Sequence, residues 1–181
     1  MIYVFLANGF EEIEALATVD VIRRAGLKVE TISTNDTLAV QGAHGICVQA
    51  DGLFDNIKTD EVQMLILPGG MPGAANLDNH EKLGALIEDF ANAKKPLAAI
   101  CAAPFVLGKR GILNNCRATC YPGFEHLLEG AVYTASQVER QGNIITAKGP
   151  GAALDFAFAI VGFFCGEKKV DELRASMMVV R

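Results

Sequence analysis

The sequence lacks the features that mark membrane-spanning and secreted proteins. Its best candidate for a bilayer span, residues 156–165, is about half as long as the roughly 20 apolar residues that such a helix needs. The first residues carry no basic lead, and no small-residue cleavage site follows them. We therefore expect a cytoplasmic protein with no membrane partner.

Basic residues are neither in excess nor clustered. The chain has 16 Lys and Arg against 21 Asp and Glu, a formal net charge of −5 and a pI near 5.2. A nucleic-acid backbone is recognised by a concentrated basic surface. We expect no specific nucleic-acid partner.

The five cysteines and three histidines do not form a metal-site pattern. Cys116 and Cys120 are separated by three residues, but no second cysteine pair or histidine pair completes a zinc site. An odd number of cysteines without a secretion signal also argues against a disulfide framework. We expect reduced thiols, no structural metal and no cofactor.

What the sequence does contain is enough apolar material for the core of one domain, residues 1–181, because 51% of its residues are hydrophobic and no linker or repeat interrupts them. Strand-like segments alternate with segments of helical periodicity, which is typical of an α/β fold with a mostly parallel sheet. The expected strands are 2–6, 28–32, 64–67, 96–100, about 117–120 and 144–147, with a small hairpin joining 38–41 to 46–49. The expected helices are 12–25, 81–93, 102–107, 152–164 and about 170–175.

Cys101 stands where the apolar run 96–100 meets a predicted helix start at Ala102. This places it at the carboxyl end of a parallel strand, where open α/β sheets bind their ligands. The free N–H groups and the dipole of a following helix stabilise a thiolate. Cys101 is therefore a candidate nucleophile, and an inert buried cysteine is the alternative.

An acidic loop follows the first predicted strand. Glu11 and Glu12 at a helix start oppose the helix dipole and need no catalytic role. Glu14 has apolar neighbours and is expected to point inward. A carboxyl group buried beside a thiolate stays protonated and donates a hydrogen bond to the sulfur.

A glycine pair, Gly69-Gly70, follows the predicted strand 64–67. Without side chains, its backbone N–H groups can approach a substrate oxygen and stabilise an oxyanion. A simple tight turn is the alternative. The loop Gly149-Pro150-Gly151 lies on the same side of the sheet, and its proline also suits a helix start.

Four motifs occur in order over nearly the full length: Asn8-Gly9-Phe10-Glu11-Glu12-Ile13-Glu14, Leu67-Pro68-Gly69-Gly70, Ala98-Ala99-Ile100-Cys101-Ala102-Ala103-Pro104 and Gly149-Pro150-Gly151. Together they resemble the ThiJ/PfpI family, which includes the parkinsonism-associated deglycase. The resemblance implies a flavodoxin-like three-layer sandwich of the class I glutamine amidotransferase-like superfamily, a nucleophile-elbow cysteine and a homodimer. It also implies Cys101 as the reactive thiol, Glu14 as its protonated partner and the Gly70 region as oxyanion donors.

Two positions depart from branches of this family. The protease branch has a histidine directly after the cysteine, where this chain has Ala102. The deglycase branch has a histidine before a proline, where this chain has Tyr121-Pro122. Tyr121 is expected to form a hydrogen bond or line the pocket, and the Ala102 N–H joins the oxyanion donors. His126, in the same loop as Tyr121, is the alternative base, because a base must come within hydrogen-bonding reach.

These residues predict a cysteine-dependent, cofactor-free enzyme for small reactive aldehydes or glycated adducts, of the glyoxalase or deglycase type. The alternative is a sensor of oxidative stress or a chaperone in which Cys101 oxidises to sulfinic acid. A role in making the thiazole phosphate of thiamine is a further reading, although Gly69-Gly70 lacks the lysine and hydroxyl of a P-loop. A protease ranks last, because Ala102 replaces the histidine.

Overall fold

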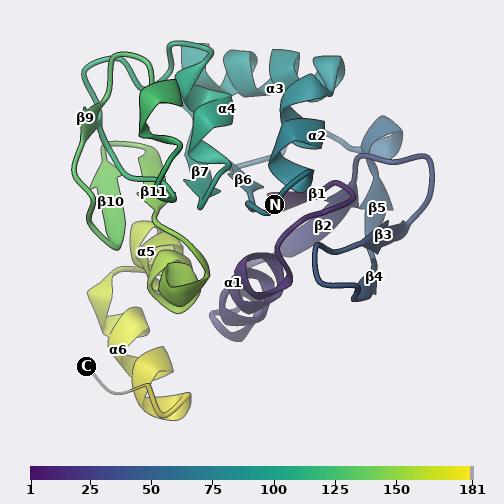
Figure 1. Cartoon of the computed structure of the whole chain (residues 1–181). Coiled ribbons are helices and arrows are strands. Elements are labelled where there is room, and N and C mark those ends of the chain that lie inside the picture. Colours follow the sequence, from purple (N-terminus) through teal and green to yellow (C-terminus); the bar gives the residue numbers. More distant parts are fainter. Residues whose placement is uncertain (180–181) are drawn as a thin grey trace.

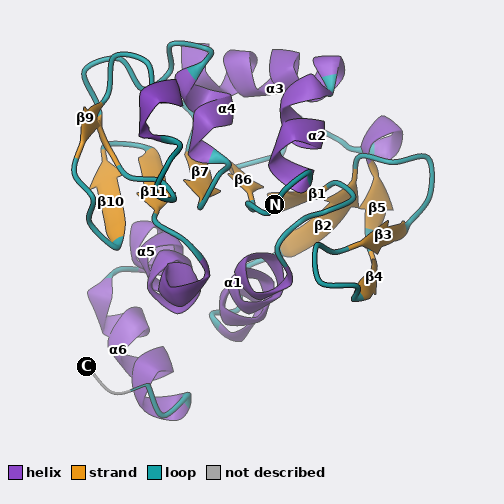
Figure 2. Cartoon of the chain, viewed as in Figure 1, coloured by secondary structure: helices purple, strands orange, loops and turns teal. Residues whose placement is uncertain are grey.

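The computed structural model describes residues 1–179, and a seven-stranded sheet forms its centre (Figures 1 and 2). Its strands are β1 (Ile2–Leu6), β2 (Val29–Ser33), β5 (Gly52–Leu53), β6 (Met64–Leu67), β7 (Leu97–Ile100), β10 (Val138–Gln141) and β11 (Ile144–Ala147). Their order is β10-β11-β7-β6-β1-β2-β5, and only the β10–β11 pair is antiparallel. Strands β1, β6 and β7 are apolar and buried throughout, as expected for parallel strands covered on both faces.

Helices cover both faces of this sheet. On one side lie α1 (Glu12–Arg24), α5 (Ala153–Cys165) and α6 (Glu167–Ser176), and on the other lie α2 (Gly73–Asn79), α3 (Glu81–Asn92) and α4 (Pro104–Gly108) (Figure 1). Alternating strand residues pack on each side: Val4 packs in one core with Phe156 of α5, and Phe5 packs in the other with Leu83 of α3. The predicted α/β class and three-layer arrangement are confirmed. Within residues 1–179, no helix combines the length and the apolar character of a membrane span.

Two small sheets lie outside the main one. Strands β3 (Ala39–Gln41) and β4 (Cys47–Gln49) pair antiparallel, which confirms the predicted hairpin. Strand β8 (Arg117–Ala118) pairs with β9 (Val132–Tyr133), so the strand predicted at about 117–120 is shorter than expected and does not join the main sheet. Short 3-10 turns occupy η1 (Phe54–Asn56), η2 (Glu125–Leu127) and η3 (Pro150–Ala152).

The loops that follow β1, β6 and β7 are brought together at the carboxyl edge of the sheet, because these strands are parallel neighbours. The first two loops are also bonded to each other: the Glu11 N–H donates to the Gly69 carbonyl (2.9 Å), and the Gly73 N–H donates to the Gly9 carbonyl (3.1 Å). Segments far apart in sequence therefore form one surface around Cys101.

Candidate functional site

Cys101 occupies a sharp turn between β7 and α4. Its φ of +65° lies in the left-handed region, which typically costs a non-glycine residue about 1–3 kcal/mol. Hydrogen bonds fix the peptide groups on both sides of Cys101. The Cys101 N–H donates to the Ala147 carbonyl (2.9 Å), and the Cys101 carbonyl accepts from the Tyr121 N–H (2.7 Å). The predicted elbow is confirmed, and these two hydrogen bonds help to hold it.

Glu14 reaches the same place from the first turn of α1. The helix begins after Glu11, whose carboxylate accepts from the Glu14 N–H (2.7 Å) as a cap. Glu14 points inward, as expected, and is 1% exposed. Its Oε2 accepts from the Gly69 N–H (2.7 Å). Its Oε1 is buried and has no nitrogen or oxygen partner in the described chain, and the carboxyl group interacts with the Cys101 thiol.

Gly69 is the spacer between this carboxyl group and this thiol. A Cβ at position 69 would lie 2.6 Å from the Cys101 Cβ and 2.8 Å from Glu14 Oε2, closer than real Cβ atoms approach other atoms. The Gly69 N–H donates its hydrogen bond to Glu14. The expectation that this N–H faces a substrate oxygen is therefore wrong. The N–H groups of Gly70 and Ala102 are the backbone donors that lower the pKa of the thiol.

The two ionisable groups share a site that resists a second negative charge. Burial, followed by the charge of Glu14, raises the pKa of Cys101 to about 12, although the Gly70 and Ala102 N–H groups act in the opposite direction. Burial likewise raises the pKa of Glu14 to about 7, and the charge of Glu11 adds to this. While Glu14 is ionised, the Cys101 thiol therefore keeps its proton.

This result corrects the expectation that a helix terminus stabilises the thiolate. Helix α4 has five residues and begins at Pro104 rather than at Ala102, because Cys101 and the two residues after it form a turn. Two individual N–H groups, those of Gly70 and Ala102, thus take the place of a helix terminus in lowering the thiol pKa.

Tyr121 and His126 come from the loop after β8. Tyr121 is 47% exposed, and its ring lies against Gly149, where an added Cβ would be 3.1 Å from Cδ2. The tyrosine lines a hollow of about 280 Å³ formed by this loop and the loop after β11, together with Pro122, Gln137, Lys148, Gly149, Pro150, Gly151 and Ala152. His126 lies in η2. It is not among the described groups that shift the pKa of the Cys101 thiol, which are Glu14, Gly70 and Ala102.

Glu12 has a structural role that the sequence did not predict. Its Oε1 accepts from the His44 N–H (2.7 Å), and its Oε2 lies 2.8 Å from His44 Nδ1, so the buried carboxylate fixes the turn between β3 and β4. Gly42 leaves room for it, since a Cβ there would collide with the Glu12 carboxyl group.

Glu11, Glu12 and His44 are also the described residues whose ligand atoms lie close enough, within 4.8 Å of one another, to hold a metal ion. The carboxylates of this cluster already accept the hydrogen bonds described above, and these account for its geometry. The cluster is a structural feature of the β3–β4 turn.

Known proteins share this architecture. Protein dj-1beta of Drosophila melanogaster is 34% identical over 178 residues, which cover 97% of this chain and 95% of the relative. Protein DJ-1 homolog A of Arabidopsis thaliana is 34% identical over 96% of this chain, but the match covers 45% of that relative, so the chain spans less than half of its length. The structure of oxidized DJ-1 from Toxoplasma gondii has a TM-score of 0.95 and 31% identity, and the match covers 99% of this chain and 98% of that one.

The family model described as the DJ-1/PfpI family matches residues 1–162. This range contains all of the loops that build the site, from Glu11 and Glu14 to Gly149. The chain therefore belongs to the DJ-1/PfpI family.

Proposed function

We propose that the chain is a cysteine-dependent enzyme that acts without a cofactor on small reactive aldehydes or glycated adducts, in the manner of a glyoxalase or deglycase. The observation that carries this proposal is the buried pair of Cys101 and Glu14, in which the carboxyl Oε1 has no hydrogen-bond partner among the described residues. A carboxyl group whose pKa is about 7 is suited to take up and release protons near neutral pH.

In the first step the Cys101 sulfur adds to the aldehyde carbon. A bond forms between sulfur and carbon, and the carbonyl π electrons move to the oxygen. Glu14 takes the thiol proton, and the N–H groups of Gly70 and Ala102, which act on the thiol, donate to the oxyanion. Return of the proton to this oxygen gives a hemithioacetal.

For a 2-oxoaldehyde, Glu14 can then move the hydrogen from the aldehyde carbon to the neighbouring carbonyl carbon by way of an enediol. This oxidises one carbon and reduces the other within the same molecule, so no external oxidant is needed. The product is a thioester on Cys101, which water hydrolyses to a 2-hydroxy acid and the free thiol.

The test is conversion of methylglyoxal to lactate by the purified protein, compared with Cys101→Ser and with Cys47→Ser. Cys47 is an exposed cysteine on β4, outside the site, and serves as the matched control. We expect turnover in the wild type and Cys47→Ser and none in Cys101→Ser. Wild-type turnover equal to that of Cys101→Ser would exclude the proposal.

A second candidate function is sensing of oxidative stress through Cys101. Cys101 is 8% exposed, and two N–H donors and the Glu14 carboxyl group act on its thiol; these groups can hydrogen-bond to the oxygens of a sulfinic acid. The oxidized relative from Toxoplasma gondii supports this candidate. After mild peroxide treatment, mass spectrometry should find Cys101 oxidised before the more exposed Cys47 and Cys165. Oxidation in the order of exposure would count against it.

A further inference from the structure

The segment that supports the Cys101 carbonyl has little regular structure of its own. The Tyr121 N–H reaches this carbonyl (2.7 Å) from the loop after β8. Strand β8 has two residues and pairs with β9, in a sheet separate from the one that carries Cys101. Something other than strand pairing must therefore place this loop against β7 and β11.

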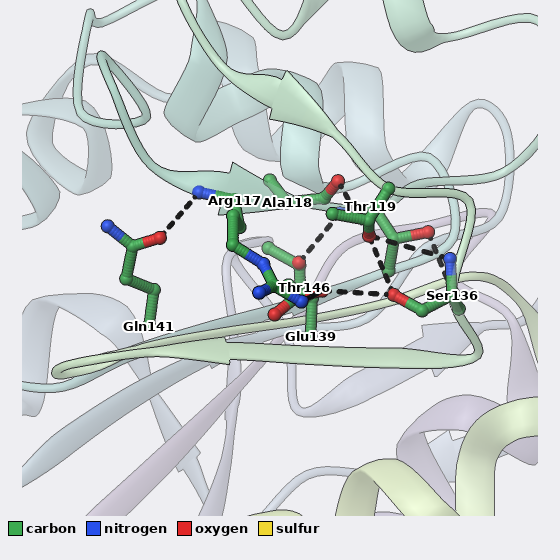
Figure 3. A network of polar contacts seen from close by, with 8 residues as sticks. Arg117, Ala118, Thr119, Ser136, Glu139, Gln141 and Thr146 are labelled. Carbon is green, nitrogen blue, oxygen red and sulfur yellow. Dashed lines mark hydrogen bonds and ion pairs between the residues drawn. The ribbon is translucent and has the colours of Figure 1, made fainter.

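Side chains of β10 and β11 make that connection (Figure 3). The Thr119 N–H donates to Thr146 Oγ1 on β11 (2.9 Å), and both threonines are buried. Thr119 Oγ1 donates to the Ser136 carbonyl (2.8 Å). At the outer end of the network, Arg117 donates its backbone N–H to Gln141 Oε1 (2.7 Å) and pairs with Glu139 (3.1 Å).

The contact between Thr119 and Thr146 closes a ring around the elbow. Thr146 is the neighbour of Ala147, whose carbonyl accepts from the Cys101 N–H (2.9 Å). The Cys101 carbonyl in turn accepts from Tyr121, which lies two residues after Thr119. One pair of adjacent residues on β11 thus fixes the elbow directly through Ala147 and indirectly through Thr146.

We propose that Thr146 is a positioning residue for Cys101: its hydroxyl holds the Thr119–Tyr121 segment so that the Tyr121 N–H keeps Cys101 in the left-handed conformation. This proposal rests on Cys101 being the reacting thiol of the proposed function. In that conformation the sulfur reaches the N–H groups of Gly70 and Ala102 and the carboxyl group of Glu14. Thr146 itself does not touch the reacting atoms, so its effect passes through the backbone of the loop.

The chemistry of the contact explains the need for a hydroxyl group. The Thr119 N–H is buried, and a buried donor without an acceptor is strongly unfavourable. A valine at position 146 has the same shape as threonine but offers no acceptor. The loop would then move to satisfy its N–H elsewhere, and the Tyr121 N–H would move with it.

The experiment measures alkylation of Cys101 by iodoacetamide as a function of pH, which needs no enzymatic turnover. We expect Thr146→Val to react about tenfold faster at neutral pH, the change that a thiol pKa lower by about one unit would cause. We also expect its pH profile to shift to lower pH, because burial and the charge of Glu14, which a displaced sulfur would lose, raise the thiol pKa more than the two N–H groups lower it. Thr146→Ser keeps the hydroxyl group and should restore the wild-type rate and profile.

Thr31→Val is the matched control. Thr31 lies on β2, which β6 and β1 separate from β7, and its buried hydroxyl group exchanges hydrogen bonds with Asp51. Its replacement removes a comparable threonine hydroxyl group and should leave the alkylation profile unchanged. An unchanged or slower rate in folded Thr146→Val, or a Thr146→Ser protein that behaves like Thr146→Val, would overturn the proposal.

Native-state hydrogen exchange tests the same proposal in the wild type and does not depend on a variant that folds. The amides of Thr119 and Tyr121 should exchange together, with protection similar to that of the Cys101 amide. Exchange of the Tyr121 amide while that of Thr119 stays protected would show that the two contacts are independent and would overturn the proposal. Failure of methylglyoxal turnover in the wild type would instead remove the proposed function and leave these two measurements interpretable.

Discussion

The Glu14 carboxyl group and the Cys101 thiol interact across the space that a side chain at position 69 would fill. The carboxyl group comes from the start of a helix and the thiol from the end of a strand, and the glycine between them comes from a third segment. The pair is therefore sensitive to changes in any of the three segments, and each can be tested separately.

Replacement of Gly69 by alanine should separate the pair. The added Cβ would meet the Cys101 Cβ and Glu14 Oε2 at less than 3.0 Å, so at least one of them must move. We expect a loss of about 1–3 kcal/mol in the free energy of unfolding, as for other overpacked sites. Cys101 alkylation at neutral pH should become faster, because the charge of Glu14, which raises the thiol pKa, moves away.

Gly151→Ala is the control for this change, because nothing lies within 4 Å of a Cβ at position 151. Urea denaturation and iodoacetamide kinetics should find this variant close to the wild type. Equal stability and reactivity of Gly69→Ala and Gly151→Ala would contradict the close approach described here.

Glu14 should make the stability of the fold depend on pH. Its pKa is 4.5 in an ordinary environment and about 7 in the folded protein, so between these values the folded state holds a proton that the unfolded state has released. Stability contributed by this group therefore falls as the pH rises from 4.5 to 7, by up to about 3 kcal/mol. Glu14→Gln cannot ionise and should escape this loss.

Urea denaturation of the wild type and Glu14→Gln between pH 4.5 and 8 measures this contribution. The wild type should become less stable relative to the variant as the pH rises. A constant difference between the two proteins over this range would show that Glu14 has the same pKa in the folded and unfolded states.

The left-handed backbone of Cys101 predicts an unusual ranking of substitutions. Alanine keeps the Cβ that makes a φ of +65° unfavourable, whereas glycine adopts this conformation readily. We expect Cys101→Gly to be more stable than Cys101→Ala by roughly 1 kcal/mol, the reverse of the usual preference for alanine over glycine. Thermal denaturation of both variants checks the order, and a more stable Cys101→Ala would contradict the role of strain.

An apolar patch beside the site predicts self-association. Ile13 and Leu16 on α1 are 58% and 37% exposed, and Ile46 is 53% exposed. Ile46 lies beside α1, as shown by the 3.4 Å distance between its N–H nitrogen and Glu12 Oε1. Burial of these side chains against a second copy would remove them from water, so we expect a homodimer through this face.

Analytical ultracentrifugation of Ile13→Asp tests this surface. The wild type should sediment as two chains of 19.3 kDa each, and the variant as one. Val132→Asp, at an equally exposed position on β9, is the control and should remain dimeric. Monomeric wild type would contradict the prediction, as would a dimer that Ile13→Asp does not affect.

Patterns within short segments were enough to predict most of the fold. The uninterrupted apolar runs of β1, β6 and β7 and the periodicity of α1, α3 and α5 come from residues that face a core. The sequence did not indicate α2 (Gly73–Asn79), which is short and begins with glycine, or β10 (Val138–Gln141), a largely polar strand at the sheet edge. Their positions are set by tertiary contacts that local pattern does not report.

The same distinction applies to the site. Glu14 was recognisable because a carboxylate among apolar residues must find a buried partner, and Cys101 because of its place at the end of a strand. The pairing of Glu12 with His44 joins residues 32 positions apart, and that of Thr119 with Thr146 joins residues 27 apart. Both depend on how separate segments meet. The same is true of the hydrogen bond from the Gly69 N–H to Glu14, which the sequence did not predict.

The hydrogen bond between Gly69 and Glu14 spans 55 residues of sequence, and this separation has a consequence for when reactivity arises during folding. Contacts between distant residues form after local ones, because the chain must first close a long loop. Until β6 and β7 have docked beside β1, Cys101 has neither its carboxyl partner nor its N–H neighbours, and it reacts like any other cysteine. The tuned thiol is therefore a property of the completed fold, and the pH profile of its alkylation reports how much of a population has reached the native state.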